Sequence, residues 1–127
     1  MARLKSKSLT EKEEEIMKVI WERGPLFVRE IVDLLPDPKP HQNTVSTFVR
    51  GLEQKGFLDH EAFGGAHRYF AAVKKSDYRG SKIGSLLRNY FDNSSRSLVS
   101  ALISEEKLSA DDLRELLDLI ESEPEKQ

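Results

Sequence analysis

The chain has 127 residues, of which 38% are hydrophobic, 33% are charged and none is cysteine. This length suits one domain, or a small domain with an appendage, and the lack of cysteine excludes disulfides, thiolate metal ligands and a cysteine nucleophile. No apolar run approaches the roughly 20 residues of a membrane span, and no secretion signal follows the basic N-terminus, so we expect a cytoplasmic protein without direct membrane binding.

The charge is unevenly distributed along the chain. The net charge is −2, but residues 105–127 hold nine acidic and three basic residues, whereas residues 1–104 hold 17 basic and 13 acidic residues. An acidic tail can hide a basic body in a whole-chain count, so nucleic acid stays open as a partner. Arg3, Lys5 and Lys7 form a basic arm, which we expect to be a solvated terminus; the alternative is an arm along DNA phosphates.

Two helices are predicted in the first third of the chain. Thr10 and Glu13 have the spacing of a capping box, which begins a helix. Apolar residues then recur at helical spacing as far as Gly24, and Trp21 is expected in the core. A short second helix over residues 28–35 is ended by the proline-rich run 36–40.

A third helix is predicted over residues 43–54, closed by Lys55 and Gly56. One side is apolar at i, i+3, i+4 and i+7 spacing, which predicts burial. That side comprises Val45, Phe48, Val49 and Leu52. The opposite side is polar and carries no acid: Asn43, Ser46, Thr47, Arg50 and Gln54. Glu53 lies near the end and off that face.

Two strand-like runs follow, over residues 57–63 and 66–73, joined by Gly64 and Gly65. Paired glycines between such runs indicate a hairpin, although bulky residues on both faces leave its register open. Three helices followed by a hairpin is the order of a winged helix-turn-helix. We therefore predict a mainly α protein with a small β-hairpin, in which residues 1–74 form a DNA-binding domain.

The remaining residues, 75–127, are predicted to be a helical dimerisation region with an acidic tail. Three apolar stripes recur there, and Ser109 is a plausible N-cap for the last helix. The stripes are Ile83, Leu86, Leu87, Tyr90 and Phe91, then Leu98, Val99, Leu102 and Ile103, then Leu113, Leu116, Leu117 and Ile120. About 50 residues make a poor core alone, so a second copy is the simplest partner. The alternative is that the stripes fold back on the N-terminal domain.

The polar face of the third helix suits a major groove of double-stranded DNA. Asn43 or Gln54 can bond an adenine edge, and Arg50 can read guanine or hold a phosphate. Thr44 and Thr47 offer a hydroxyl to phosphate and a methyl to thymine. The predicted DNA-binding set is Asn43, Thr44, Ser46, Thr47, Arg50 and Gln54, with His67 and Arg68 after the hairpin tip.

Other functions have less support. The face is also compatible with an ordinary solvated helix or a protein-interaction module, but the absence of acid favours DNA. No phosphate loop, nucleophile motif or metal-type histidine pair is found, so we predict no enzyme, cofactor or metal, with His41, His60 and His67 at the surface. A repressor released by a small ligand would show a pocket lined by Tyr69, Tyr78 or Tyr90, and the sequence shows none.

The chain resembles the BlaI/MecI/CopY family of penicillinase-repressor-type transcriptional regulators. The matching segments are LTEKEEEIMKVIWERGPLFVREIVDLL, NTVSTFVRGLEQKGFL, HRYFAAV and SLVSALISEEKLSADDLRELLDLI. The resemblance spans about residues 9–121 and implies a homodimer whose third helices enter major grooves of an inverted-repeat operator overlapping a promoter. The resemblance also implies that the bound dimer blocks transcription.

The resemblance also implies how such a repressor is released. In the penicillinase and methicillin branches, a membrane sensor with a metalloprotease domain controls a cut at an Asn-Phe bond in the dimerisation region. The matching bond here is Ala101-Leu102, in which both residues differ. The copper branch uses C-terminal cysteines, and this chain has none, so that mechanism is excluded.

Overall fold

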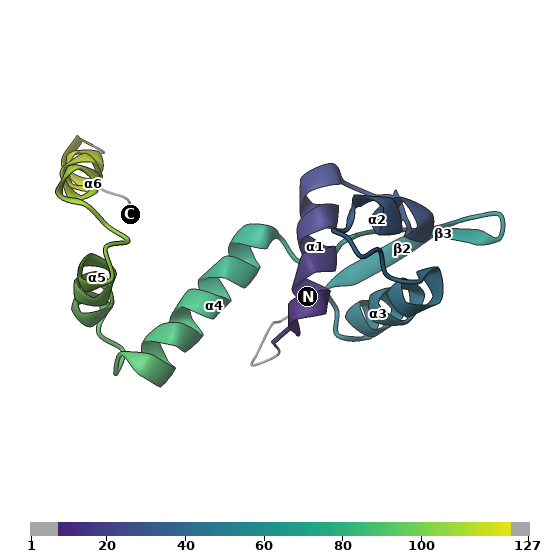
Figure 1. Ribbon diagram of the computed structural model, residues 1–127, viewed down its shortest axis with the longest axis horizontal. Helices are drawn as coiled ribbons and strands as arrows, with labels where there is room; N and C mark the ends of the chain where they lie inside the picture. Colours follow the sequence, from purple (N-terminus) through teal and green to yellow (C-terminus); the bar gives the residue numbers. More distant parts are fainter. Residues whose placement is uncertain (1–7, 123–127) are drawn as a thin grey trace. The chain divides into compact units, whose positions relative to one another are not determined.

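The structure, a computed structural model, describes residues 8–122, so the basic arm predicted at Arg3, Lys5 and Lys7 lies outside the described residues. The chain divides into two compact units, the first ending at Ser81 and the second beginning at Lys82. The elements of the first unit are α1 (Glu11–Arg23), β1 (Leu26–Phe27), α2 (Val28–Leu34), α3 (Gln42–Gln54), β2 (Leu58–Phe63) and β3 (Ala66–Ala71) (Figure 1). Helix α4 (Lys75–Tyr90) crosses the division, and α5 (Ser95–Ser104) and α6 (Ala110–Ser122) follow.

Helix α1 begins at the predicted capping box. The Thr10 hydroxyl accepts a bond from the Glu13 amide at 3.2 Å, and the Glu13 carboxylate accepts one from the Thr10 amide at 2.9 Å. Glu13 is itself buried and pairs with the Lys55 ammonium at 2.9 Å. Burial raises the pKa of the Glu13 carboxyl, but Lys55 and the Thr10 amide outweigh burial and leave that pKa lowered. The start of α1 is thereby tied to the end of α3.

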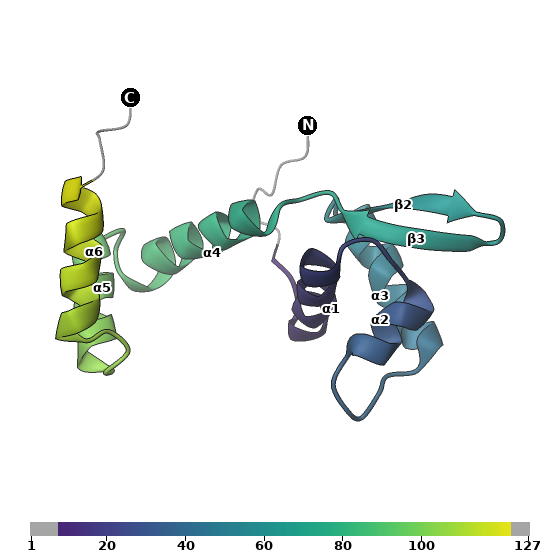
Figure 2. The ribbon, with the colours of Figure 1, turned by 90° about the horizontal axis from the view of Figure 1, so that it is seen from above.

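A three-stranded antiparallel sheet in the order β1-β3-β2 completes the first unit. The hairpin predicted around Gly64 is confirmed, and its register pairs Leu58 with Ala71 and Phe63 with Ala66. Only Gly64 of the two glycines has a positive φ, of 58°. The short strand β1 was not predicted, because two residues carry no periodic pattern. Figure 2 shows α1, α2 and α3 on one side of the β2–β3 hairpin.

The core of the first unit lies where the three helices meet the sheet. Its buried members include Ile16, Met17, Ile20, Ile31, Val45, Val49, Leu52, Phe57 and Leu58. Trp21 lies at the edge of this core, only partly buried, and its Nε1 donates to the Val73 carbonyl at 2.8 Å. Tyr78, from the start of α4, is also buried, with its ring 5.7 Å from Trp21 and 5.6 Å from Phe57.

Tyr78 therefore belongs to the first core. Its hydroxyl donates to the Glu14 carboxylate at 2.6 Å. Burial, and then the Glu14 carboxylate, raise the Tyr78 pKa well above that of a free tyrosine. The expected boundary between residues 74 and 75 coincides with the start of α4, whereas the contacts divide the chain about two helical turns later, after Ser81.

The second unit contains the rest of α4 together with α5 and α6. The Ser94 hydroxyl caps α5 through the Ser97 amide. Ser109 caps α6 as predicted: its hydroxyl accepts from the Asp112 amide, and the Asp112 carboxylate accepts from the Ser109 amide, both at 3.1 Å. No residue between 82 and 122 is buried in this unit. None of the helices within residues 8–122 is long and apolar enough to cross a membrane.

Candidate nucleic-acid interface

Helix α3 presents its polar side to solvent because its apolar side is anchored in the core. Val45, Val49 and Leu52 are buried and leave no freedom for the helix to rotate about its axis. The helix begins one residue earlier than predicted, at Gln42, and its N-cap is His41, whose Nδ1 accepts from the Asn43 amide at 3.0 Å. Opposite the core, the exposed residues are Asn43, Thr47, Arg50 and Gln54, with Ser46 half-buried.

A groove of about 550 Å³ runs between α3, the start of α2 and the hairpin. Arg50 and Ser46 line it from α3, and His67 lines it from β3. On the other side of Arg50, a shallower hollow is lined by Thr47, Gln54, Glu53 and Gly51. Arg50 borders both hollows, so its guanidinium is central to the exposed surface.

Thr44 is separated from the rest of the predicted set. It lines a different hollow, beside Lys12 and the proline run at Pro36 and Pro40. Thr47 remains with the set, and its hydroxyl donates to the Asn43 carbonyl at 3.1 Å within the helix. The structure thus brings together Asn43, Ser46, Thr47, Arg50 and Gln54, with Thr44 toward another side of α3.

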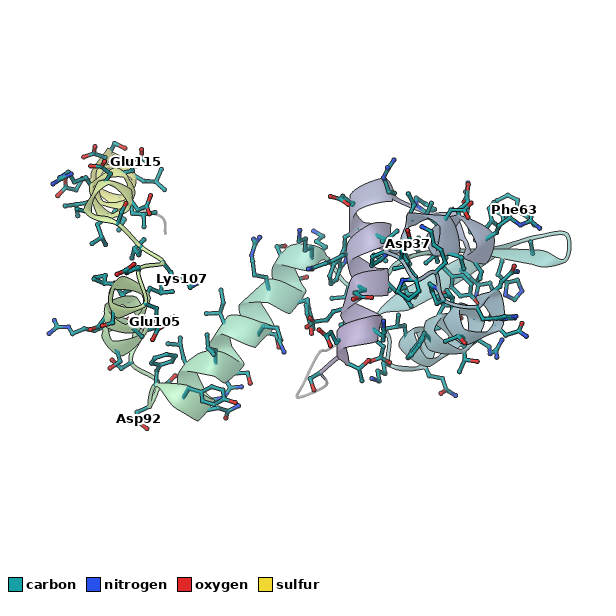
Figure 3. All side chains as sticks on the ribbon, viewed as in Figure 1. Asp37, Phe63, Asp92, Glu105, Lys107 and Glu115 are labelled. Carbon is teal, nitrogen blue, oxygen red and sulfur yellow. The ribbon has the colours of Figure 1, made fainter. Side chains whose placement is uncertain are left out.

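The two hairpin residues differ in their surroundings, because successive strand residues face opposite sides of a sheet. His67 shares a side with the buried Tyr69 and lines the groove. Arg68 faces the other way, where its guanidinium donates to the Glu61 carboxylate at 2.9 Å and lies 4.7 Å over the ring of Phe63. Phe63 is labelled on the hairpin in Figure 3. His67 therefore joins the α3 set, and Arg68 lines neither hollow.

The groove contains three polar residues that the sequence analysis did not select, among them Glu30, whose carboxylate accepts from the Phe27 amide at 2.9 Å. Arg29 enters it from α2, and Gln42 enters it from the first turn of α3. Gln42 lies one position before the predicted start of the helix, so helical periodicity extended by one residue would have included it. Arg29 had no such signal, because only the packing of α2 against α3 places it there.

The wall of the groove includes Tyr69, whose pKa is raised first by burial and then by the Glu53 carboxylate, with Arg50 acting in the opposite direction. Its phenol stays neutral over the ordinary pH range and can donate a hydrogen bond. Glu53 is the acid of α3, and its carboxylate lies 3.0 Å from the Nδ1 of His60 in β2. Between Asn43 and Arg50, the polar face of α3 therefore carries no acidic residue.

The residues predicted for dimerisation are largely exposed. Tyr90, Leu116, Leu117 and Ile120 are exposed, and Leu87, Phe91, Leu98 and Leu102 are half-buried. Leu86 and Leu113 are also exposed. The bond between Ala101 and Leu102 lies inside α5, so a protease would have to unwind that helix locally to reach it.

Comparison with known proteins gives a consistent result. Residues 9–122 match the family described as Penicillinase repressor. The chain is 27% identical over 114 residues to the penicillinase repressor of Bacillus licheniformis, which covers 89% of each chain. It is 24% identical over 117 residues to the methicillin resistance regulatory protein MecI of Staphylococcus aureus (strain N315), covering 91% of this chain and 95% of that protein.

Among solved structures, the chain is similar to the DNA-binding domain of the repressor BlaI, with a TM-score of 0.51 and 28% identity. That likeness covers 61% of this chain and 94% of the BlaI domain. The predicted winged helix-turn-helix is thereby confirmed, and the matched relatives are repressors rather than enzymes. The chain therefore belongs to the penicillinase repressor family.

Proposed function

We propose that this protein is a transcriptional repressor that binds an inverted-repeat DNA operator as a homodimer. The observation that carries the proposal is the exposed polar face of α3, which is anchored by a buried opposite face and flanked by the hairpin groove. An α-helix fits the B-DNA major groove, where amide and guanidinium groups distinguish base pairs. Because Arg50 borders both hollows, it is the first candidate for a base or phosphate contact.

The residues proposed to contact DNA form a central group, expected to contact bases, and a peripheral group, expected to contact the DNA backbone. Asn43, Ser46 and Thr47 lie toward the N-terminal half of α3, which in helix-turn-helix proteins usually contacts the bases. Gln54 lies in the last turn and His67 on the hairpin, where contacts to the DNA backbone are expected. Thr44 and Arg68 are assigned lesser roles, since Thr44 lines a different hollow and Arg68 is paired with Glu61.

The second unit is proposed to hold the dimer together. Within α6 the side chains of Leu116, Leu117 and Ile120 are 48%, 53% and 72% exposed, although their spacing is that of a buried stripe. Contiguous exposed apolar side chains on a protein usually mark an interaction surface. A second copy of the chain can bury this surface, because a two-fold symmetric dimer packs the same patch of both chains together. The second copy also supplies the second α3 that an inverted repeat needs.

Release from the operator would then follow from weakening the dimer. A cut in α5 separates α6 from the rest of the chain, and Ala101-Leu102 is the bond to examine, with a membrane sensor protease as the agent. The test is expression of the chain beside its inducing system and mass analysis of the fragments. Fragments ending at Ala101 support this route, and an intact chain on a freed operator points to a different signal.

The experiment that tests the proposed function is selection of bound duplexes from a random DNA pool at near-physiological salt. An enriched inverted repeat is expected, and the recovered sequence gives the half-site spacing. Binding should weaken with salt, by a slope in log K against log salt of about −0.9 for each phosphate neutralised. A pool without enrichment and a flat salt dependence would favour the alternative, a winged helix that binds proteins.

A further inference from the structure

Three potential metal ligands meet where α3 ends and the hairpin begins. One donor atom from each of Glu53, Asp59 and His60 lies within 4.8 Å of the other two. Both carboxylate oxygens of Glu53 are 3.0 Å from the Nδ1 of His60. The three residues come from two elements, since Glu53 is in α3 and the other two are in β2.

The local charge favours a cation. Two carboxylates face one imidazole, and among residues 8–122 neither Glu53 nor Asp59 forms an ion pair with a lysine or arginine. By contrast, the neighbouring Glu61 is paired with Arg68 and Glu13 with Lys55. The Glu53 and His60 side chains are only 31% and 29% exposed, so water screens this excess negative charge incompletely.

The His60 ring is held in position by aromatic neighbours. It stacks on the His67 ring with centroids 4.0 Å apart and planes 13° from parallel. The Tyr69 ring adds a tilted contact at 5.6 Å. This stacking restricts rotation of the His60 ring, whose Nδ1 lies 3.0 Å from both carboxylate oxygens of Glu53.

We propose that Glu53, Asp59 and His60 form a zinc site at the junction of the reading helix and the hairpin. Zinc accepts imidazole nitrogen at about 2.0–2.1 Å and carboxylate oxygen at about 2.0–2.2 Å, usually with four ligands. The three donor atoms lie within 4.8 Å of one another, and a water molecule completes a tetrahedron around an ion bound among them. Calcium and magnesium fit less well, since they prefer oxygen ligands only.

The site adjoins the proposed DNA-contacting residues, because Glu53 lines the same hollow as Thr47, Arg50 and Gln54. A bound ion links the last turn of α3 to β2, and His67, which stacks on His60, lines the groove. The ion thereby sets the position of the hairpin relative to α3. This consequence rests on the proposed DNA-binding function, whereas the existence of the site does not.

The test is titration of the tag-free full chain with Zn²⁺ by calorimetry, and with Co²⁺ by visible absorption, both without DNA. We expect one ion per chain, visible bands typical of tetrahedral Co²⁺, and a raised melting temperature with Zn²⁺. The variants Glu53→Gln, Asp59→Asn and His60→Gln should each weaken Zn²⁺ binding at least about tenfold. Asp59 is exposed, so Asp59→Asn keeps the test valid if another variant fails to fold.

Two matched variants serve as controls. Glu61→Gln removes a carboxylate one residue beyond His60, and His41→Asn removes an exposed histidine while keeping a residue type favoured at helix N-caps. Both should bind Zn²⁺ as the parent does. The proposal is overturned if the parent shows no saturable binding, or if the three site variants bind as tightly as the two controls. Either result leaves selection of an operator by the parent chain unaffected.

Discussion

The two units of the chain differ in whether their apolar stripes are buried. In the first unit, apolar side chains from α1, α2, α3 and the sheet converge on one buried core. In the second unit, stripes with the same helical spacing remain exposed or half-buried, and none of its described residues is buried. A hydrophobic stripe predicts that burial will occur but does not say against what. The first unit buries its apolar stripes within its own core, and we infer that the second unit buries its stripes against another chain.

The largest expected effect comes from breaking the second unit. The double variant Leu117→Glu/Ile120→Glu places charge on the exposed stripe of α6, where a dimer interface would have to bury it. We expect a monomer, and a fall in affinity for a full inverted repeat of about 10²- to 10⁴-fold, because the second half-site is no longer bound intramolecularly. Sedimentation and DNA titration measure the two effects. A variant that remains dimeric would remove α6 from the interface.

A matched pair of leucines tests the contrast between the units directly. Leu52 is fully buried and Leu116 is 48% exposed. Leu52→Ala should cost about 2–5 kcal/mol in the free energy of unfolding of the first unit, whatever the protein concentration. Leu116→Ala should instead reduce the part of the stability that rises with protein concentration, since it weakens association. Thermal unfolding at several concentrations distinguishes them, and equal behaviour of both variants would contradict the division.

The next effect concerns the reading helix. Arg50→Ala should weaken operator binding by about 1–3 kcal/mol if Arg50 reads a guanine, and should then relax the preference at one base position. If Arg50 holds a phosphate, binding should weaken similarly on every sequence and the salt slope should fall by about one contact. Arg88→Ala removes the same charge from α4 and serves as control. Unchanged binding by the Arg50 variant would exclude it from the interface.

The smallest expected effect lies at the edge of the first core. Tyr78→Phe keeps the ring contacts with Trp21 and Phe57 but removes the hydrogen bond to Glu14, at a cost of about 1 kcal/mol. Because folding raises the Tyr78 pKa, its contribution to stability is complete below the unfolded pKa of about 10 and is lost as pH rises further. Denaturant titrations between pH 8 and 11 measure this loss of stability. An equally steep loss in the Tyr78→Phe variant would mean that a group other than Tyr78 causes it.

Much of the fold was predictable because it depends on local signals. The Thr10 capping box, the stripe on α3, Gly56, and the Ser109 cap are each visible within a few residues, and each is present in the structure. Features that depend on packing between distant segments were not predictable. The strand β1 forms only because Leu26 and Phe27 meet β3. Tyr78 joins the first core only because α4 begins beside Trp21.

For the proposed DNA-binding surface too, the features that depend on local sequence were predictable and those that depend on contacts between elements were not. Helical periodicity placed Asn43, Thr47 and Arg50 together, because it fixes which residues share a face. It could not show that Thr44 faces the proline run or that Arg68 is engaged by Glu61, because those contacts involve other elements. The cluster of Glu53, Asp59 and His60 was missed for a related reason. Its members join a helix to a strand, so no single periodic pattern contains them.

The central claim is that two chains read one operator, each through its own α3. The most direct measurement is the number of chains on a duplex recovered by selection, determined by native mass spectrometry or sedimentation across a range of protein concentrations. The account predicts two chains bound cooperatively to a full inverted repeat, with residues 1–81 alone binding each half-site singly. One full chain per duplex at undiminished affinity would contradict it.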